Sequence, residues 1–103
     1  MSGRIDGFDW DESNLAKCQK HGVTIEEIEA VFLHPHRLAP DIRRSGAETR
    51  FIAIGSGGRD RLIFIAFTLR GAASGRTIRP ISARYMHDKE VKRYEEAIAK
   101  THQ

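Results

Sequence analysis

The chain has 103 residues, of which 40% are hydrophobic and 30% charged. This length suits one domain with a modest core, and the hydrophobic fraction excludes an intrinsically disordered chain. The longest purely apolar run, residues 62–67, is too short to span a membrane, and residues 1–10 lack the apolar core of a signal peptide. We therefore expect one cytoplasmic domain over residues 1–103, with the single cysteine, Cys18, free in a reducing compartment.

Charge is unevenly distributed along the chain. Residues 1–36 hold three Lys/Arg and seven Asp/Glu, whereas residues 37–94 hold thirteen Lys/Arg and five Asp/Glu. Twelve of the 17 cations are arginine, whose planar guanidinium can bind a phosphate through two hydrogen bonds. The basic segment indicates either a phosphate-rich partner such as a nucleic acid or charges scattered over ordinary surface, and charge alone favours neither.

Two helices are predicted first. One covers Glu12–His21, with an aspartate at position 9 or 11 as its cap. The next has the clearest start signal in the chain, because Thr24 and Glu27 form a capping box ahead of an apolar helical period. His34, which precedes a proline, marks its end.

The hydrophobic period then changes to that of strands. Strands are predicted at residues 37–42, 50–56, 61–69 and 76–84, with turns at residues 57–60 and 71–75. Pro80 has no N–H, so we expect it at an unpaired edge or a bulge.

The last predicted helix begins near His87 or Asp88 and ends at about Lys100, with an apolar face formed by Val91, Tyr94 and Ile98. Short turns between successive strands predict an antiparallel meander of three to four strands. The expected fold class is α+β, with two N-terminal helices, the sheet and a C-terminal helix, the helices packed on one face.

Five segments in order resemble one known family. They are FDWD at residues 8–11, KHGVTIEEIEAVF at 20–32, ETRFIAIG at 48–55, RDRLIFIAFTLRG at 59–71 and RPISARYMHDKEVKRYEEA at 79–97. Together they cover nearly the whole chain, and the set resembles the BrnT family of ribonuclease toxins from type II toxin–antitoxin modules.

This resemblance implies a RelE-like toxin fold and an endoribonuclease that needs no metal and no cofactor. In such enzymes the 2′-hydroxyl of the RNA attacks the adjacent phosphate, and the cleavage inhibits translation. The resemblance also implies a ribbon-helix-helix, BrnA-like antitoxin as partner. Toxin and antitoxin would form a hetero-oligomer, in which only the antitoxin binds operator DNA.

Five residues are the catalytic candidates under this resemblance. Arg84, at the end of the last strand, and Arg61, at the start of the central strand, are assigned to the phosphate, although both could be ordinary surface ion pairs. His87, Glu90 and Tyr94 are candidates for proton transfer. The alternative roles are helix-start contacts for His87 and Glu90 and core packing for Tyr94.

A second group holds the substrate-binding candidates: Arg50, Arg79, Tyr85, Lys89 and His21. The arginines and the lysine would contact phosphates, with solvated surface charge as their alternative. Tyr85 would stack on a base, and His21 either enters the active cleft or caps the first helix.

The residues Cys18, His21, His34 and His36 form a nominal four-ligand set for zinc. We expect no metal there, since the helix between the two pairs already has complete caps and an apolar stripe. The main alternative to an enzyme is a nucleic-acid-binding or regulatory protein of the same fold without catalysis. A third possibility is a domain that only sequesters its partner.

Overall fold

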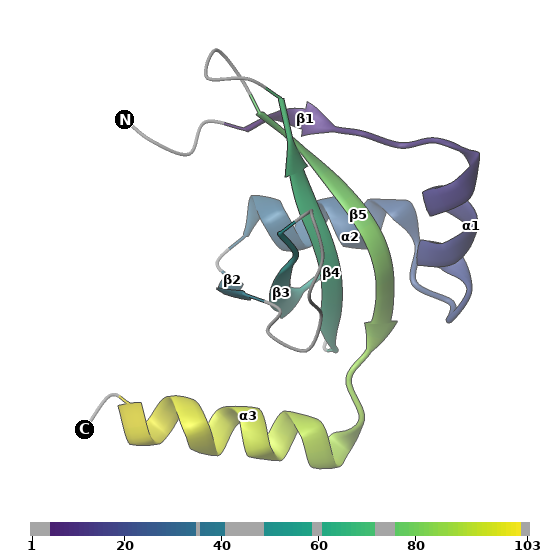
Figure 1. Cartoon of the computed structure of the whole chain (residues 1–103). Helices are drawn as coiled ribbons and strands as arrows, with labels where there is room; N and C mark the ends of the chain where they lie inside the picture. Colours follow the sequence, from purple (N-terminus) through teal and green to yellow (C-terminus); the bar gives the residue numbers. More distant parts are fainter. Residues whose placement is uncertain (1–4, 35, 41–48, 59–60, 72–75, 102–103) are drawn as a thin grey trace.

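The computed structural model describes residues 5–34, 36–40, 49–58, 61–71 and 76–101 (Figure 1). The elements follow in the order β1 (Ile5–Phe8), α1 (Glu12–Gln19), α2 (Ile25–Leu33), β2 (His36–Pro40), β3 (Phe51–Ser56), β4 (Leu62–Arg70), β5 (Arg76–Tyr85) and α3 (Asp88–Thr101). The predicted α+β class is confirmed. The predicted strand bounds agree within one residue where the structure describes them, but residues 41–42 and parts of both predicted turns lie outside the described residues.

The sheet has the strand order β1-β5-β4-β3-β2. Strands β2 to β5 form the expected antiparallel meander. The first strand was not predicted, and it pairs parallel to β5, with Ile5 opposite Arg76 and Phe8 opposite Ile78. Its sequence, IDGF, has no alternating pattern and contains a glycine, so its strand conformation depends on pairing with a segment far along the chain.

Pro80 lies at a β-bulge, as predicted. The register of β4 and β5 shifts between Ala66, which faces Ser82, and Phe67, which faces Pro80. An extra residue in β5 is therefore accommodated next to the proline, whose missing N–H would otherwise leave a gap in the ladder. The Pro80 carbonyl accepts a buried 2.9 Å hydrogen bond from Asn14 Nδ2, which ties α1 to β5.

Both predicted N-terminal caps are present. Asp11 caps α1 by accepting hydrogen bonds from the backbone N–H groups of Ser13 and Asn14, and the Asn14 side chain accepts one from the backbone of Asp11. Thr24 and Glu27 form the capping box of α2. Helix α1 ends two residues earlier than predicted, before Gly22, whose φ of +91° is the left-handed conformation that suits glycine.

The core lies between one face of the sheet and helices α1 and α2. Its buried residues are Cys18, Val23, Ile28 and Val31 from the helical part, and Ala53, Ile63, Ile65, Phe67, Ile78 and Ala83 from the strands. Burial of each large aliphatic side chain contributes roughly 1.5–3 kcal/mol. This face is therefore occupied by packing over most of its length, and polar chemistry has to use the other face or the sheet ends.

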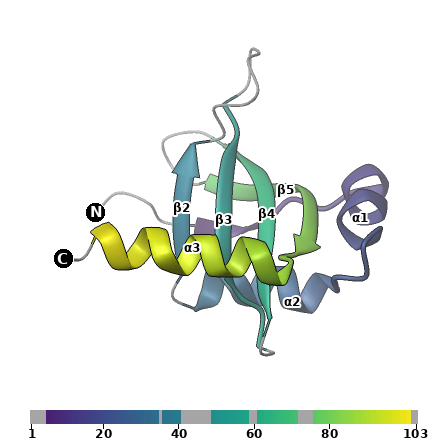
Figure 2. The ribbon, with the colours of Figure 1, turned by 90° about the horizontal axis from the view of Figure 1, so that it is seen from below.

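Helix α3 does not pack on that face, so the expectation that all helices share one face was wrong. Figure 2 shows α3 crossing in front of β2, β3 and β4, with α2 behind them. Val91, Tyr94 and Ile98 are only partly buried, and none of the three belongs to the core cluster of the described residues. An apolar stripe three residues long in an otherwise charged helix does not determine which face of a sheet the helix covers.

Candidate active site

One cross-strand row of side chains defines the face of the sheet opposite the core. Arg37 faces Ile54, Ile54 faces Phe64, and Phe64 faces Arg84. The neighbouring row contains Ala53, Ile65 and Ala83, which are buried in the core. Because side chains alternate between faces, the row that holds Arg84 points away from α1 and α2. We call this face, which α3 crosses, the outer face.

Three of the catalytic candidates, Arg84, His87 and Glu90, are brought together where β5 runs into α3, which we call the junction. Arg84 donates two hydrogen bonds to Glu90, from Nη1 to Oε1 at 2.7 Å and from Nη2 to Oε2 at 2.9 Å. The backbone N–H of His87 donates to the same Oε1 at 3.0 Å. The Arg84 guanidinium also lies 4.6 Å from the centre of the Phe64 ring. Three contacts therefore hold the partly exposed guanidinium, and the bond from His87 holds the carboxylate that it pairs with.

The Glu90 carboxylate is a weak base in this arrangement. Its pKa is lowered from 4.5 to about 2, first by the hydrogen bonds from Arg84 and second by the backbone N–H of His87. Glu90 is therefore ionised at neutral pH and binds a proton only reluctantly. Its geometry suits holding Arg84 in place better than it suits removing a proton from a hydroxyl.

Tyr94 lies further along α3, beside Arg37. Burial raises the pKa of the Tyr94 hydroxyl above 10.0, and the charge and hydrogen bond of Arg37 oppose this only in part. At neutral pH the phenol is therefore protonated and can donate a hydrogen bond. Arg37 was not among the predicted site residues, because its place opposite Ile54 follows only from strand pairing.

Arg61 and Tyr85 form a second group at the same end of the sheet. The Arg61 guanidinium lies 4.0 Å from the centre of the Tyr85 ring. The Tyr85 hydroxyl lies 2.7 and 2.9 Å from the two carboxylate oxygens of Glu27 and donates one hydrogen bond that they share. Tyr85 thus points toward α2, away from Arg84. Arg61 also lines a cleft of ≈ 370 Å³. The other lining residues are Ser56, Leu62, Met86, Asp88, Val91 and Glu95, so the cleft lies between Arg61 and the first half of α3.

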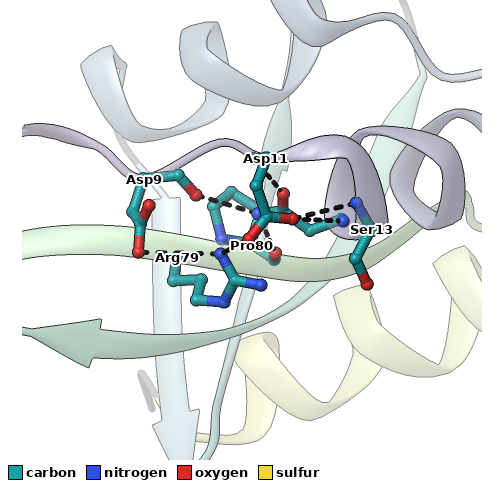
Figure 3. A network of polar contacts seen from close by, with 6 residues as sticks. Asp9, Asp11, Ser13, Arg79 and Pro80 are labelled. Atoms are coloured by element: carbon teal, nitrogen blue, oxygen red, sulfur yellow. Dashed lines mark hydrogen bonds and ion pairs between the residues drawn. The ribbon is translucent and has the colours of Figure 1, made fainter.

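Arg50 and Arg79 lie apart from the junction, in the wall of a small cavity beside α1. Both line a cavity of ≈ 190 Å³ together with Ser13, Asn14, Lys17, Thr68, Pro80 and Ile81. Arg79 Nη1 lies 2.9 Å from Asp11 Oδ2 and 3.6 Å from Asp9 Oδ2, a network that Figure 3 shows at close range. The hydrogen bond from Arg79 is the largest of the influences that lower the pKa of Asp11. Lys17 was not predicted as a site residue, because nothing in the helical pattern of α1 distinguishes it from Lys20.

The last two predicted contacts stand apart from these groups. Lys89 is exposed in the first turn of α3, and His21 is exposed in the turn after α1. In the part of the chain that the structure describes, neither side chain forms a hydrogen bond or ion pair with Arg84 or Glu90.

The four residues of the nominal zinc set have different environments. Cys18 is completely buried in the core, and burial raises the pKa of its thiol to about 11. His34 is exposed, and its Nδ1 lies 2.7 Å from the Ala30 carbonyl oxygen. Within the described ranges, no group of three or more His, Cys, Asp or Glu side chains is placed to hold a metal ion. No helix of the described chain is long and apolar enough to cross a membrane.

Comparison with protein families gives a match over residues 10–90 to the family described as the ribonuclease toxin, BrnT, of type II toxin–antitoxin systems. The matched range includes Arg61 and the whole Arg84–Glu90 junction, whereas β1 and most of α3 lie outside it. A search of the curated proteins finds no match. The family resemblance seen in the sequence is confirmed, and the chain belongs to the BrnT family of ribonuclease toxins of type II toxin–antitoxin systems.

Proposed function

We propose that the protein is a toxin whose activity is metal-independent cleavage of RNA at the junction of β5 and α3. The observation that supports this most directly is the guanidinium of Arg84, held by Glu90 through two hydrogen bonds and left partly exposed, with 36% of the side chain accessible. A fixed guanidinium is a suitable donor for the charge that develops on a phosphate during transfer.

In the proposed reaction the 2′-oxygen of the RNA attacks the adjacent phosphorus, and the bond from phosphorus to the 5′-oxygen breaks. The products are a 2′,3′-cyclic phosphate and a 5′-hydroxyl. A base accepts the proton of the 2′-hydroxyl, and an acid supplies one to the departing 5′-oxygen. Arg84 stabilises the extra negative charge on the phosphate, and Arg61, at the same end of the sheet, adds a second positive charge.

His87 is the proposed proton carrier. It is exposed, its backbone N–H bonds to Glu90, and histidine is the side chain most often used for general acid–base catalysis. Glu90 positions Arg84, because a carboxylate with a pKa of about 2 is poorly matched to proton abstraction at neutral pH. Tyr94, with its raised pKa, would donate a hydrogen bond or stack on a base.

We further propose that the cleaved RNA includes messages in translation, so that expression in the cytoplasm stops protein synthesis and growth. The family implies an antitoxin partner. We propose that this partner is a small ribbon-helix-helix, BrnA-like protein encoded by the neighbouring gene, which brings the complex to operator DNA. A genome in which no small gene adjoins this one would count against this part of the proposal.

The test is cleavage of a labelled single-stranded RNA by purified protein in the presence of EDTA. Wild type should produce fragments with cyclic phosphate ends. Arg84→Ala should lower kcat by about 100-fold or more, the usual cost of a lost oxyanion donor. Arg84→Lys should also be slow, because an ammonium cannot make two parallel hydrogen bonds. Arg93→Ala is the matched control, since Arg93 is an exposed arginine of α3 outside the junction.

Two outcomes would contradict the proposal. If Arg84→Ala combined with Arg61→Ala cleaves RNA at the wild-type rate, the site is wrong. If wild-type protein binds RNA and leaves it intact under all conditions, the protein is a non-catalytic nucleic-acid-binding member of the family. The non-catalytic function is retained as the alternative because Arg84 already forms an ion pair with Glu90, which offsets the positive charge that a phosphate would need.

A further inference from the structure

We propose that the small cavity between α1, β4 and β5 is a phosphate-binding subsite for the RNA strand, separate from the Arg84 junction. This proposal rests on the proposed function, because the subsite would bind another part of the same RNA substrate. Its volume is ≈ 190 Å³, several times the ~30 Å³ that one water molecule takes in the liquid. A phosphate group with some hydration therefore fits.

Three cationic side chains line this cavity: Lys17 from α1, Arg50 ahead of β3, and Arg79 from β5. Arg79 is held by the carboxylates of Asp9 and Asp11, which fix its position and offset its charge (Figure 3). Lys17 and Arg50 form no ion pair within the described part of the chain. The attraction for an anion therefore comes mainly from Lys17 and Arg50, while Arg79 supplies donors in a fixed place.

A buried hydroxyl in the wall of the cavity points to a polar ligand. Thr68 is 0% exposed and lines the cavity. Among the described residues its Oγ1 is the buried side-chain polar atom without a hydrogen-bond partner. Such an atom costs roughly 1–3 kcal/mol if nothing satisfies it. A phosphate oxygen in the cavity would accept the hydrogen bond that Thr68 can donate.

The Thr68–Arg79 pair in the cavity wall belongs to the outer face, like Arg84, and α1 closes the cavity from beside β5 (Figure 2). Thr68 faces Arg79 across the β4–β5 ladder, and Phe64 faces Arg84. Phe64 and Thr68 are four residues apart on β4, so their side chains share one face about 13 Å apart. A single RNA strand that places one phosphate at Arg84 can thus place another, a few nucleotides away, in the cavity.

The test is binding of a fluorescein-labelled single-stranded RNA with 2′-O-methyl groups throughout, which cannot undergo attack by the 2′-oxygen. Fluorescence anisotropy gives Kd at several salt concentrations. Lys17→Ala should weaken binding by roughly three- to tenfold, the range for a partly exposed charged contact. It should also lower the salt dependence by about 0.7 in the log–log slope, as expected for one lost phosphate contact on a single strand.

Lys20→Ala is the matched control. Both lysines are exposed and close to the end of α1, but only Lys17 lines the cavity. Thr68→Val, which keeps the shape and removes the hydroxyl, should weaken binding while leaving thermal stability at or above the wild-type value. With cleavable RNA, Lys17→Ala should raise KM and leave kcat within twofold.

Equal effects of Lys17→Ala and Lys20→Ala, or a loss of kcat at unchanged Kd, would overturn the subsite without affecting the proposed catalysis. Selective weakening by Lys17→Ala in a protein that cleaves no RNA would retain the subsite and refute the proposed catalysis. A wild-type protein that fails to bind the RNA at low salt would also overturn the subsite.

Discussion

Replacing Glu90 by glutamine should destabilise the protein in a way that depends on pH. The substitution keeps the size of the side chain but removes its charge and leaves one oxygen in place of two. Arg84 then loses one of its two hydrogen bonds and the ionic part of the other. The contact joins α3 to β5, so its loss should weaken the attachment of the helix to the outer face.

The size of the effect follows from the pKa of Glu90. A pKa of about 2 in place of 4.5 would correspond to about 3 kcal/mol if the whole effect reached folding stability. About one third of each side chain is exposed, 36% for Arg84 and 34% for Glu90, and solvent screening reduces the contribution of such a pair to about 1 kcal/mol. We therefore expect Glu90→Gln to lower Tm at pH 7 by about 4–8 °C.

The pH dependence has a definite sign. Folding lowers the pKa of Glu90, so its contribution is fully present above pH 4.5 and is lost as the pH falls from 4.5 toward about 2. Urea denaturation at pH 7, 5, 4 and 3 should show the difference between wild type and Glu90→Gln shrinking over the last two steps. Glu96→Gln, an exposed substitution on the same helix, is the control. A difference as large at pH 3 as at pH 7, or none at pH 7, would refute the reasoning.

Three further predictions concern the framework of the site. Asn14→Ala removes the buried hydrogen bond to Pro80 and should lower the free energy of unfolding by about 1–3 kcal/mol in urea titrations, whereas the neighbouring exposed Ser13→Ala should cost far less. Tyr85→Phe removes from Glu27, 5% exposed, the hydrogen bond that the hydroxyl shares between the two carboxylate oxygens. It should lower Tm measurably by circular dichroism, and an unchanged Tm would mean that water replaces the hydroxyl at no cost. Cys18, buried and with a pKa of about 11, should react with iodoacetamide at pH 8 only in denaturant, and rapid labelling of native protein would contradict its burial.

The features that the sequence predicted well have short-range causes. Thr24 and Glu27 pair their hydrogen-bonding groups within one helical turn, and the continuous apolar run at residues 62–67 needs no distant partner to indicate a buried strand. Pro80 predicted either an unpaired edge or a bulge, because proline has no N–H to donate in any surroundings, and the structure has the bulge. The approach of Arg84, His87 and Glu90 was also predictable, because a strand that runs directly into a helix keeps these residues close in space.

The features that were missed depend on pairing between distant segments. The strand β1 exists because β5 offers it an open edge. Arg37 became part of the site through its register with Ile54, and Lys17 through the packing of α1 against β5. The face that α3 covers was predicted wrongly, since three apolar residues suit either face equally and the contact of Arg84 with Glu90 decides between them.

Under the proposed function, RNA binding and charge stabilisation are carried by different residues of the outer face. The charge of Arg84 is already balanced by Glu90, so an incoming phosphate gains little net attraction there and must compete with a carboxylate for the same fork. Under the proposed function, affinity for RNA comes mainly from cations whose charge is less compensated, such as Lys17 and Arg50. In the proposed reaction, Glu90 keeps Arg84 in the orientation that a phosphate needs as negative charge develops on it. On this reasoning, losses at the cavity raise KM and losses at the junction lower kcat, because binding and charge stabilisation are carried by different residues.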